Sequence, residues 1–538
     1  MTLKTNPLSR SLAVTVFLGF AGSALAQSQP DPSMEAGETE TAASVSQQGS
    51  GPDYDGGNFM DVRLNLTLTN ENVLVEPGDT IPNVPGWRFG RPSSLGVLFF
   101  DNYDTRFSGY ETLSHLVLYK HHDSGHHEVE GGLVLRINNL AQNRINLSDA
   151  GTYLRYAYWF DKERKSPERI SVTGFPTSSD RFRLGYSFRL SWGGSNVYRR
   201  SDSEKPGIKV QYDGRNGYAF VGAKSSVLLD NGKGKGEQVS VMGFLAGGGY
   251  DLTDMLRVEA NLGIFDRGNN ELSQYLNEKV LLVGASTQVS LHKGAPIGRS
   301  VDFALYRNDP ERIRELFRRP VWESGTSWQI AAEATVIGQT LKDPEVDGGT
   351  TVQLGYAGDI NARLRTGNFR YRLDLQARNA AFILHPTPSL PTYSEFPDEY
   401  EQTPNLFAAA GFDYRIPSTP VTTGVIVGVD MPATLTNPTG VLAGIDGDAN
   451  AMEGTTIVIR GEGDLEILPP GEKAMPQYAV KSVSRLDIAD NFATLIDAYY
   501  SYDPNEARYR RDGPEELRQR VFGQFHQLGF NVTLQARF

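Results

Sequence analysis

The sequence contains no cysteine in 538 residues and only 5 tryptophans. Without cysteine the chain can form neither a disulfide nor a thiolate-bound metal centre. After residue 26 it also lacks any apolar run close to the ~20 residues that a membrane-spanning helix needs. The fold must therefore be stabilised by burial and by backbone pairing, without covalent cross-links.

The first 26 residues have the three parts of a secretory signal peptide. Lys4 and Arg10 supply the positive charge, residues 12–21 form a short apolar run, and Ala24 to Ala26 form a cleavage site of small residues. Gln27 follows at the position where a lipoprotein has cysteine, so lipid attachment is excluded. The pattern predicts an exported protein with a signal peptide over residues 1–26.

The next stretch is acidic and poor in apolar residues. Residues 27–61 carry no Lys or Arg, and their acidic side chains are Asp31, Glu35, Glu38, Glu40, Asp53, Asp55 and Asp61. Such a composition cannot bury enough apolar surface to fold alone. We expect residues 27–58 to form a disordered acidic tail in the periplasm. This tail supplies much of the formal net charge of −12.

From residue 59 onward, apolar and polar residues alternate in stretches of ~10, which is the period of a strand with one apolar face. Turn residues separate the stretches, and no long helical pattern interrupts them. Residues 182–192 show the most regular alternation, from Phe182 to Trp192, and are predicted as a strand. The other clear stretches are 62–68, 129–137, 154–160, 256–264, 283–291, 352–360, 369–377 and 492–502.

The final stretch, residues 527–538, decides what kind of sheet this is. Apolar residues occupy every second position from Leu528 to Phe538, with polar residues or glycine between them. A last strand of this kind, ending on an aromatic residue, resembles the closing strand of a Gram-negative outer-membrane β-barrel. The resemblance implies that Phe538 is part of the signal read by the barrel-insertion machinery.

The spacing of the stretches supports a single barrel over residues 59–538. Connections such as residues 251–255 and 489–491 are tight, whereas residues 70–94, 161–180, 384–405 and 503–523 are long. Short periplasmic turns with long extracellular loops are typical of outer-membrane barrels. We therefore predict an all-β transmembrane antiparallel barrel of about 18 to 20 strands. Residues 161–180 and 384–405 are the candidates for a loop folded into the lumen.

If the apolar positions face lipid, the alternate positions face the lumen. Arginine on the lipid face would cost ~2–4 kcal/mol near the bilayer midplane, so the arginines must point inward. Two interpretations stay open: the arginines pair with acids such as Glu128, Glu130 and Asp359 and brace the wall, or they attract anions. The predicted lumen-lining residues are Arg136, Arg155, Arg181, Arg183, Arg189, Arg363, Arg365, Arg370, Arg372, Arg378 and Asp374.

Four of the 8 histidines fall in one predicted hairpin turn: His121, His122, His126 and His127. Imidazoles from the two arms could surround Zn, Ni or Cu, and we take these four as a candidate metal site. Adjacent histidines point to opposite faces of a strand, so at most one of each pair converges. A solvated polar turn is the alternative interpretation.

In general architecture the chain resembles porin-like channels of the outer membrane, and no particular family motif is matched. The resemblance implies passive or weakly selective diffusion of small hydrophilic solutes, anions among them. An arginine-lined lumen also occurs in exporters of acidic polysaccharide, such as the alginate-export barrels, which is a variant of this hypothesis. A different class is a non-conducting barrel that is part of a surface, envelope or secretion complex.

Other functions have little support in the sequence. There is no G-x-S-x-G motif, and we expect neither enzymatic activity nor a cofactor. The acidic chain has no basic platform with exposed aromatic residues, so nucleic acid is not an expected partner. The expected partners are outer-membrane lipids, lipopolysaccharide, the barrel-assembly machinery and small solutes. A second copy of the chain or an envelope-complex partner is left open.

Overall fold

The computed structural model describes residues 58–70, 86–89, 115–141, 144–149, 151–179, 182–198, 203–230, 237–269, 279–294, 325–343, 345–386, 400–437, 454–461, 464–510, 519–523 and 525–538. The predicted signal peptide and, apart from Asn58, the predicted acidic tail lie outside these residues. No helix in the described part of the chain is long and apolar enough to cross a membrane.

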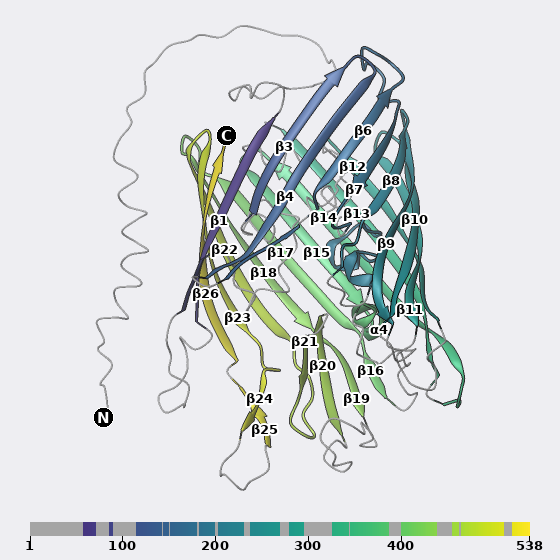
Figure 1. The fold of residues 1–538 in the computed structure, drawn as a ribbon. Helices are drawn as coiled ribbons and strands as arrows, with labels where there is room; N and C mark the ends of the chain where they lie inside the picture. Colours follow the sequence, from purple (N-terminus) through teal and green to yellow (C-terminus); the bar gives the residue numbers. More distant parts are fainter. Residues whose placement is uncertain are drawn as a thin grey trace. The chain divides into compact units, whose positions relative to one another are not determined.

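The described strands form a closed antiparallel ring (Figure 1). The sheet has 20 strands. In the described residues, β2 (Gly86–Phe89) and β5 (Arg144–Asp149) each pair with one neighbour only, which leaves 18 strands in the ring. The ring strands pair in sequence order, and β1 pairs with both β3 and β26, which closes the barrel. The predicted all-β antiparallel barrel is confirmed.

The ring strands are β1 (Phe59–Asn70), β3 (His115–Ser124), β4 (His127–Ala141), β6 (Tyr153–Trp159), β7 (Arg169–Phe175), β8 (Gly207–Asp213), β9 (Gly217–Asp230), β10 (Glu237–Thr253), β11 (Leu256–Asn269), β12 (Lys279–Lys293), β13 (Thr326–Lys342), β14 (Thr350–Thr366), β15 (Phe369–Arg378), β17 (Asn405–Arg415), β18 (Val421–Met431), β22 (Gln477–Ala489), β23 (Phe492–Tyr502) and β26 (His526–Arg537).

The C-terminal strand closes the barrel to its last residue. β26 pairs with β1 from Asp61↔Arg537 to Asn70↔Leu528. The N–H of Phe538 donates to the carbonyl of Met60 at 2.9 Å, and the N–H of Met60 donates back at 2.8 Å. Phe538 itself is 57% exposed. The alternation of residues 528–538 therefore marks a closing strand, as the sequence predicts.

Apolar side chains cover the outside of the ring and polar ones line the inside. On β11, Val258, Leu262 and Ile264 are exposed, whereas the intervening residues Glu259 and Asn261 are buried. The same alternation repeats on β12, β13 and β15. In a soluble protein the exposed face would be polar, so this inverted pattern identifies a membrane-spanning barrel.

The two ends of the barrel differ in the length of their connections. One end, which carries the C-terminus and is the upper end in Figure 1, has the short turns 125–126, 214–216, 254–255, 367–368 and 490–491. At the other end of the barrel lie the strand ends that are joined by the long connections 71–114, 176–206, 379–404, 432–476 and 503–525. One long connection, 294–325, belongs to the short-turn end, and residues 295–324 lie outside the described residues. The two ends thus match the predicted arrangement of short periplasmic turns and long extracellular loops.

Exposed aromatic residues gather near the short-turn end. Phe160, Tyr212 and Tyr250 are 53%, 45% and 54% exposed at strand ends on this side. The rings of Phe369 and Tyr414 are in tilted contact, with centroids 4.5 Å apart, beside the β14–β15 turn. Aromatic rings at this height are typical of the membrane–water interface of a barrel.

The prediction of a strand at residues 182–192 is wrong. These residues contain one short 3-10 turn, η4 (Phe188–Leu190), in otherwise irregular backbone, and a second, η5 (Ser195–Val197), follows them. The missing strand is β7, within the stretch predicted as the long loop 161–180. β7 is short and exposes only Ile170 and Val172 as large apolar residues, so its alternation is weak. The alternating apolar side chains of residues 182–192 are buried inside the barrel instead of facing lipid.

Beyond the ring, the long connections build two small sheets. One sheet consists of β16 (Glu401–Thr403), β19 (Ala433–Asn437), β20 (Thr455–Gly461) and β21 (Asp464–Ile467). The other is the pair of β24 (Ala507–Arg510) and β25 (Gln519–Phe522). The first sheet packs on α4 (Ala380–Leu384), where Ile383 and Leu384 share an apolar cluster with Leu435 and Ile459.

Candidate functional site: the lumen and the segments inside it

Residues 182–198, here called the inner segment, lie against the inner face of the barrel wall. The indole N–H of Trp192 donates to Ser286 Oγ of β12 at 2.9 Å, and the N–H of Gly185 donates to Asn261 Oδ1 of β11 at 3.2 Å. Both wall residues alternate with exposed apolar residues, so they point into the barrel. The long connection 176–206 therefore folds into the lumen, where the sequence predicted loop entry only for residues 161–180 and 384–405.

An apolar cluster anchors the inner segment. Phe182, Leu184 and Trp192 are at most 2% exposed and pack with wall residues that point inward. The wall members of this cluster include Leu228, Leu245, Phe265, Leu282 and Ile337. A polar lumen could not hold these side chains, so the wall over β9–β13 is locally apolar and matches them. This explains why the alternation of residues 182–192 imitates a lipid-facing strand.

Three charged wall residues hold the backbone of this connection. The ammonium of Lys224, on β9, donates to the carbonyls of Ser179, Phe182 and Gly193 at 3.0, 2.5 and 2.7 Å. The carboxylate of Glu333, on β13, accepts the N–H groups of Tyr186 and Ser187 at 2.8 and 2.5 Å.

Arg267, on β11, donates from Nε to the carbonyl of Val197 at 2.7 Å. Lys224, Arg267 and Glu333 are all at least nine-tenths buried. Hydrogen bonds from a charged donor, such as the Lys224 ammonium or the Arg267 guanidinium, are stronger than neutral ones. The shape of the inner segment is therefore fixed through its backbone by the wall.

A second connection also enters the barrel, at residues 379–386. Asn379 caps α4 by accepting the N–H of Phe382 at 2.9 Å. Phe382 packs against Gly355 on the inner face of β14, where an added Cβ would lie 2.9 Å from the Phe382 Cα. Glycine thus allows the helix to approach the wall. Of the stretch 384–405 that the sequence predicted as a loop folded into the lumen, Leu384, His385 and Pro386 belong to this connection.

The tip of the inner segment reaches the opposite side of the lumen. The guanidinium of Arg189 lies 4.3 Å from the centre of the Phe407 ring, which is on β17. Beside it, Arg378 on β15 donates to Asn405 Oδ1 at 2.9 Å, and Asn405 donates to Asp430 Oδ1 at 2.6 Å. The inner segment thus spans from β9 to β17 and narrows the lumen between them.

Four arginines form a patch on the inner face of β14 and β15, near the short-turn end. Arg363 lies directly opposite Arg372, and Arg365 lies directly opposite Arg370. Arg372 is buried and donates from Nε to Asp374 Oδ2 at 2.9 Å, whereas Arg365 is exposed. Arg370 also lies directly opposite Asp413 of β17, so like and unlike charges meet in this patch.

The other predicted lumen-lining arginines lie in different surroundings. Arg155, on β6, pairs with Glu128 at 2.8 Å and with Glu130 at 3.0 Å. Arg183 belongs to the inner segment, where its guanidinium lies 3.5 Å from the carbonyl of Ser191. Arg136 is exposed on β4, and Arg181 lies outside the described residues. Pairing with acids is thus present at Arg155 and, within the arginine patch, at Arg372, whereas attraction of anions stays a prediction.

The sequence missed Lys224, Arg267 and Glu333, the residues that hold the inner segment. Each is a single charged residue in an alternating strand and looks like any other lumen-facing position. Their role becomes visible only once it is known that residues 182–198 fold into the lumen. The sequence predicted residues 182–192 as a strand of the wall.

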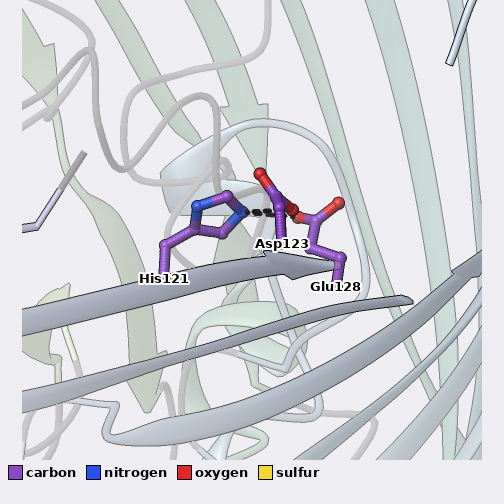
Figure 2. A group of neighbouring side chains, drawn as sticks. All are labelled: His121, Asp123 and Glu128. Atoms are coloured by element: carbon purple, nitrogen blue, oxygen red, sulfur yellow. Dashed lines mark ion pairs between the residues drawn. The ribbon is translucent and has the colours of Figure 1, made fainter. Parts of the chain in front are cut away.

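The four histidines of the β3–β4 hairpin are not brought together. His122 and His127 are exposed, and His127 Nδ1 lies 2.8 Å from the hydroxyl of Tyr156. His126 Nδ1 donates to the carbonyl of Trp159 at 2.8 Å. Instead, His121 meets Asp123 and Glu128, the one group of three metal-ligand residues among the described residues (Figure 2).

A scan against models of known protein families finds no match, and a sequence search of curated proteins finds none either. Solved structures do resemble the barrel. OpdQ of Pseudomonas aeruginosa is 8% identical, with a TM-score of 0.40, covering 89% of this chain and 97% of that one.

Two further solved structures are similar at the same level. OccK1 (OpdK) of Pseudomonas aeruginosa is 9% identical, with a TM-score of 0.38, covering 89% of this chain and 98% of that one. A loop-deletion mutant of OmpT, an outer membrane protein of Vibrio cholerae, is 9% identical with a TM-score of 0.31, covering 89% and 98%. Likeness of this degree carries no argument about function, and the barrel is established by its own strand pairing.

Proposed function

We propose that the protein is a porin-like channel in the outer membrane of a Gram-negative bacterium and that it passes small hydrophilic anions. The observation that carries the proposal is the arginine patch of Arg363, Arg365, Arg370 and Arg372. Asp374 and Asp413 lie beside these four arginines, so the patch carries two more positive than negative side chains on the lumen face. Guanidinium groups are always charged and bind carboxylate or phosphate with two parallel hydrogen bonds.

The narrowed lumen supports selection rather than free passage. The inner segment contacts β14 through the hydrogen bond from Ser187 to Asp359 and reaches β17 at Phe407. The arginine patch lies on the short-turn side of these contacts, so it lines the approach to the narrowed part of the lumen. Oriented arginines along such a path set the sign of the ions that enter. The proposal includes no catalytic step and no cofactor.

The outer membrane is proposed as the location from the chain itself. The apolar outer face, the aromatic ring near the short-turn end and the closing strand that ends on Phe538 suit a barrel inserted there. Lipids and lipopolysaccharide would then cover its outside, and the assembly machinery would recognise its last strand.

The test is the reversal potential of the refolded protein in a planar bilayer under a salt gradient. The variant combines Arg363→Gln, Arg365→Gln and Arg370→Gln. The matched control removes three cations from exposed turns at the same mouth, with Lys162→Gln, Lys165→Gln and Arg215→Gln. We expect anion preference in the wild type and in the control, and its loss in the arginine variant with conductance retained.

Other outcomes would redirect the proposal. A silent wild-type barrel that co-purifies with a stoichiometric partner would favour the non-conducting component of an envelope complex. Conductance blocked by acidic oligosaccharides, with little passage of small anions, would favour the exporter of acidic polysaccharide. Unchanged selectivity in the arginine variant would exclude the patch as its determinant.

A further inference from the structure

A second constellation lies on the β3–β4 hairpin, away from the arginine patch. His121 Nε2 is 3.1 Å from Asp123 Oδ1 and 3.4 Å from Glu128 Oε1, and the three ligand atoms all lie within 4.8 Å of one another (Figure 2). His121 and Asp123 are two residues apart on β3 and share its inner face. Glu128 lies directly opposite Asp123 on β4. The hairpin register therefore brings the three side chains together, and the same alternation sends His122 to the other face.

The separations fit a metal ion better than a hydrogen-bonded triad. A divalent first-row ion with bonds of ~2.1 Å places neighbouring ligands ~3.0 Å apart at right angles and ~3.4 Å apart in a tetrahedron. Both separations from His121 Nε2 fall close to this range. The His121 side chain is 8% exposed, and its Nε2 has no hydrogen-bond partner among the described residues. A buried imidazole nitrogen thus points at two carboxylates without the geometry of a hydrogen bond.

A positive group already occupies the position between the carboxylates. A guanidinium nitrogen of Arg164 lies 2.7 Å from Asp123 Oδ1 and 3.7 Å from Glu128 Oε2. Arg164 belongs to the turn between β6 and β7, its side chain is 25% exposed, and its backbone has a positive φ of 56°. A partly exposed arginine on a turn with positive φ is held less firmly than the buried Arg155. Arg155 would stay, because it also pairs with Glu130.

From these contacts we infer that His121 Nε2, Asp123 and Glu128 bind a divalent transition-metal ion at the short-turn mouth of the barrel, in exchange for the guanidinium of Arg164. One imidazole with two carboxylates suits Zn²⁺, Ni²⁺ or Cu²⁺, whereas Ca²⁺ and Mg²⁺ prefer oxygen ligands alone. The three protein ligands leave further coordination positions to water. This site uses one of the four clustered histidines, and its other two ligands are acids.

The experiment is isothermal titration of Zn²⁺ into the tag-free, full-length barrel in detergent, with folding checked by the heat-dependent shift in gel mobility. We expect one ion per barrel. His121→Gln is expected to weaken binding at least tenfold, and the matched control His122→Gln to leave it unchanged. Arg164→Gln is expected to tighten binding at least threefold, because the competing cation is gone.

The Arg164 variant separates this site from adventitious binding by exposed histidines. If binding persists in His121→Gln and disappears when His122, His126 and His127 are replaced, the exposed cluster holds the ion and the inference is overturned. Weaker binding in Arg164→Gln would equally contradict the exchange. Failure of both the wild type and Arg164→Gln to bind Zn²⁺, Ni²⁺ or Cu²⁺ would exclude the site.

Discussion

Arg267 and His385 are joined by a hydrogen bond of 2.5 Å, from the guanidinium of β11 to the backbone carbonyl at the end of the α4 segment. The same guanidinium holds the carbonyl of Val197 in the inner segment at 2.7 Å. Arg267 is fully buried and donates hydrogen bonds to both connections that enter the barrel. One wall residue therefore couples the two parts of the constriction.

Replacing Arg267 by methionine is expected to loosen the constriction. The change keeps most of the side-chain volume but leaves the carbonyls of Val197, His385 and Pro386 without their donor, and each buried unpaired group costs ~1–3 kcal/mol. We expect larger and noisier single-channel currents than in the wild type. Arg485→Met is the control, since Arg485 pairs with Asp487 on β22 at 2.8 Å. Equal noise in both variants would show that Arg267 does not hold the constriction.

The α4 segment should loosen in acid because of His385. Burial lowers the pKa of His385 to about 3, with nearby Arg267 adding to the effect, whereas the unfolded value is about 6.5. The folded pKa lies below the unfolded one, so the open state takes up the extra proton. Stability of the segment is therefore complete above about pH 6.5 and falls by ~1.4 kcal/mol per pH unit toward pH 3.

Hydrogen exchange of residues 380–386 at pH 7.5 and 4.5, corrected for the intrinsic rate, measures this loss. Protection should fall at pH 4.5 in the wild type. His385→Asn removes the titrating ring but keeps a donor toward the Phe382 carbonyl, which Nδ1 of His385 approaches at 2.6 Å. In this variant protection should stay the same at both pH values, and an equal fall would assign the pH effect to another group.

Much of the wall can be read from the sequence because two environments impose a period of two. Wherever lipid meets one face and a polar lumen the other, as on β11 and β15, alternation identifies the strand. The C-terminal strand was recognisable for the same reason, and its pairing to Phe538 follows from it. Closure of the barrel then fixes the strand order without further information.

The contents of the lumen could not be predicted in this way. Residues 182–192 alternate because Phe182, Leu184 and Trp192 fill an apolar part of the lumen wall, and sequence alone cannot distinguish that wall from lipid. In β7 only Ile170 and Val172 carry the opposite signal. The grouping of His121 with Asp123 and Glu128 could not be predicted for a related reason. The hairpin register brings these three together, and a cluster of histidines in the sequence does not reveal the register.

Removing one arginine from the arginine patch is expected to stabilise the barrel and to reduce its anion selectivity. Arg363 faces Arg372, and a facing pair of like charges costs roughly 0.2–1 kcal/mol relative to a neutral pair. Arg363→Gln is therefore expected to raise the urea midpoint of unfolding slightly and to lower the anion preference of the channel. The two readouts come from the same protein, by tryptophan fluorescence and by reversal potential. A lower urea midpoint would indicate that Arg363 is held by acids and stabilises the wall.

The apolar outer face makes a depth-dependent prediction that distinguishes a lipid-covered wall from any soluble sheet. Leu262, in the middle of β11, is 59% exposed, and Met255, in the β10–β11 turn, is 41% exposed. Leu262→Arg should cost ~2–4 kcal/mol of unfolding free energy in lipid vesicles, because the charge would lie near the bilayer midplane, and Met255→Arg only ~0–1 kcal/mol at the interface. In detergent micelles the difference should shrink, since the headgroups adapt around the charge. Similar costs at both positions in vesicles would mean that β11 does not cross the hydrocarbon layer at the depth assigned here.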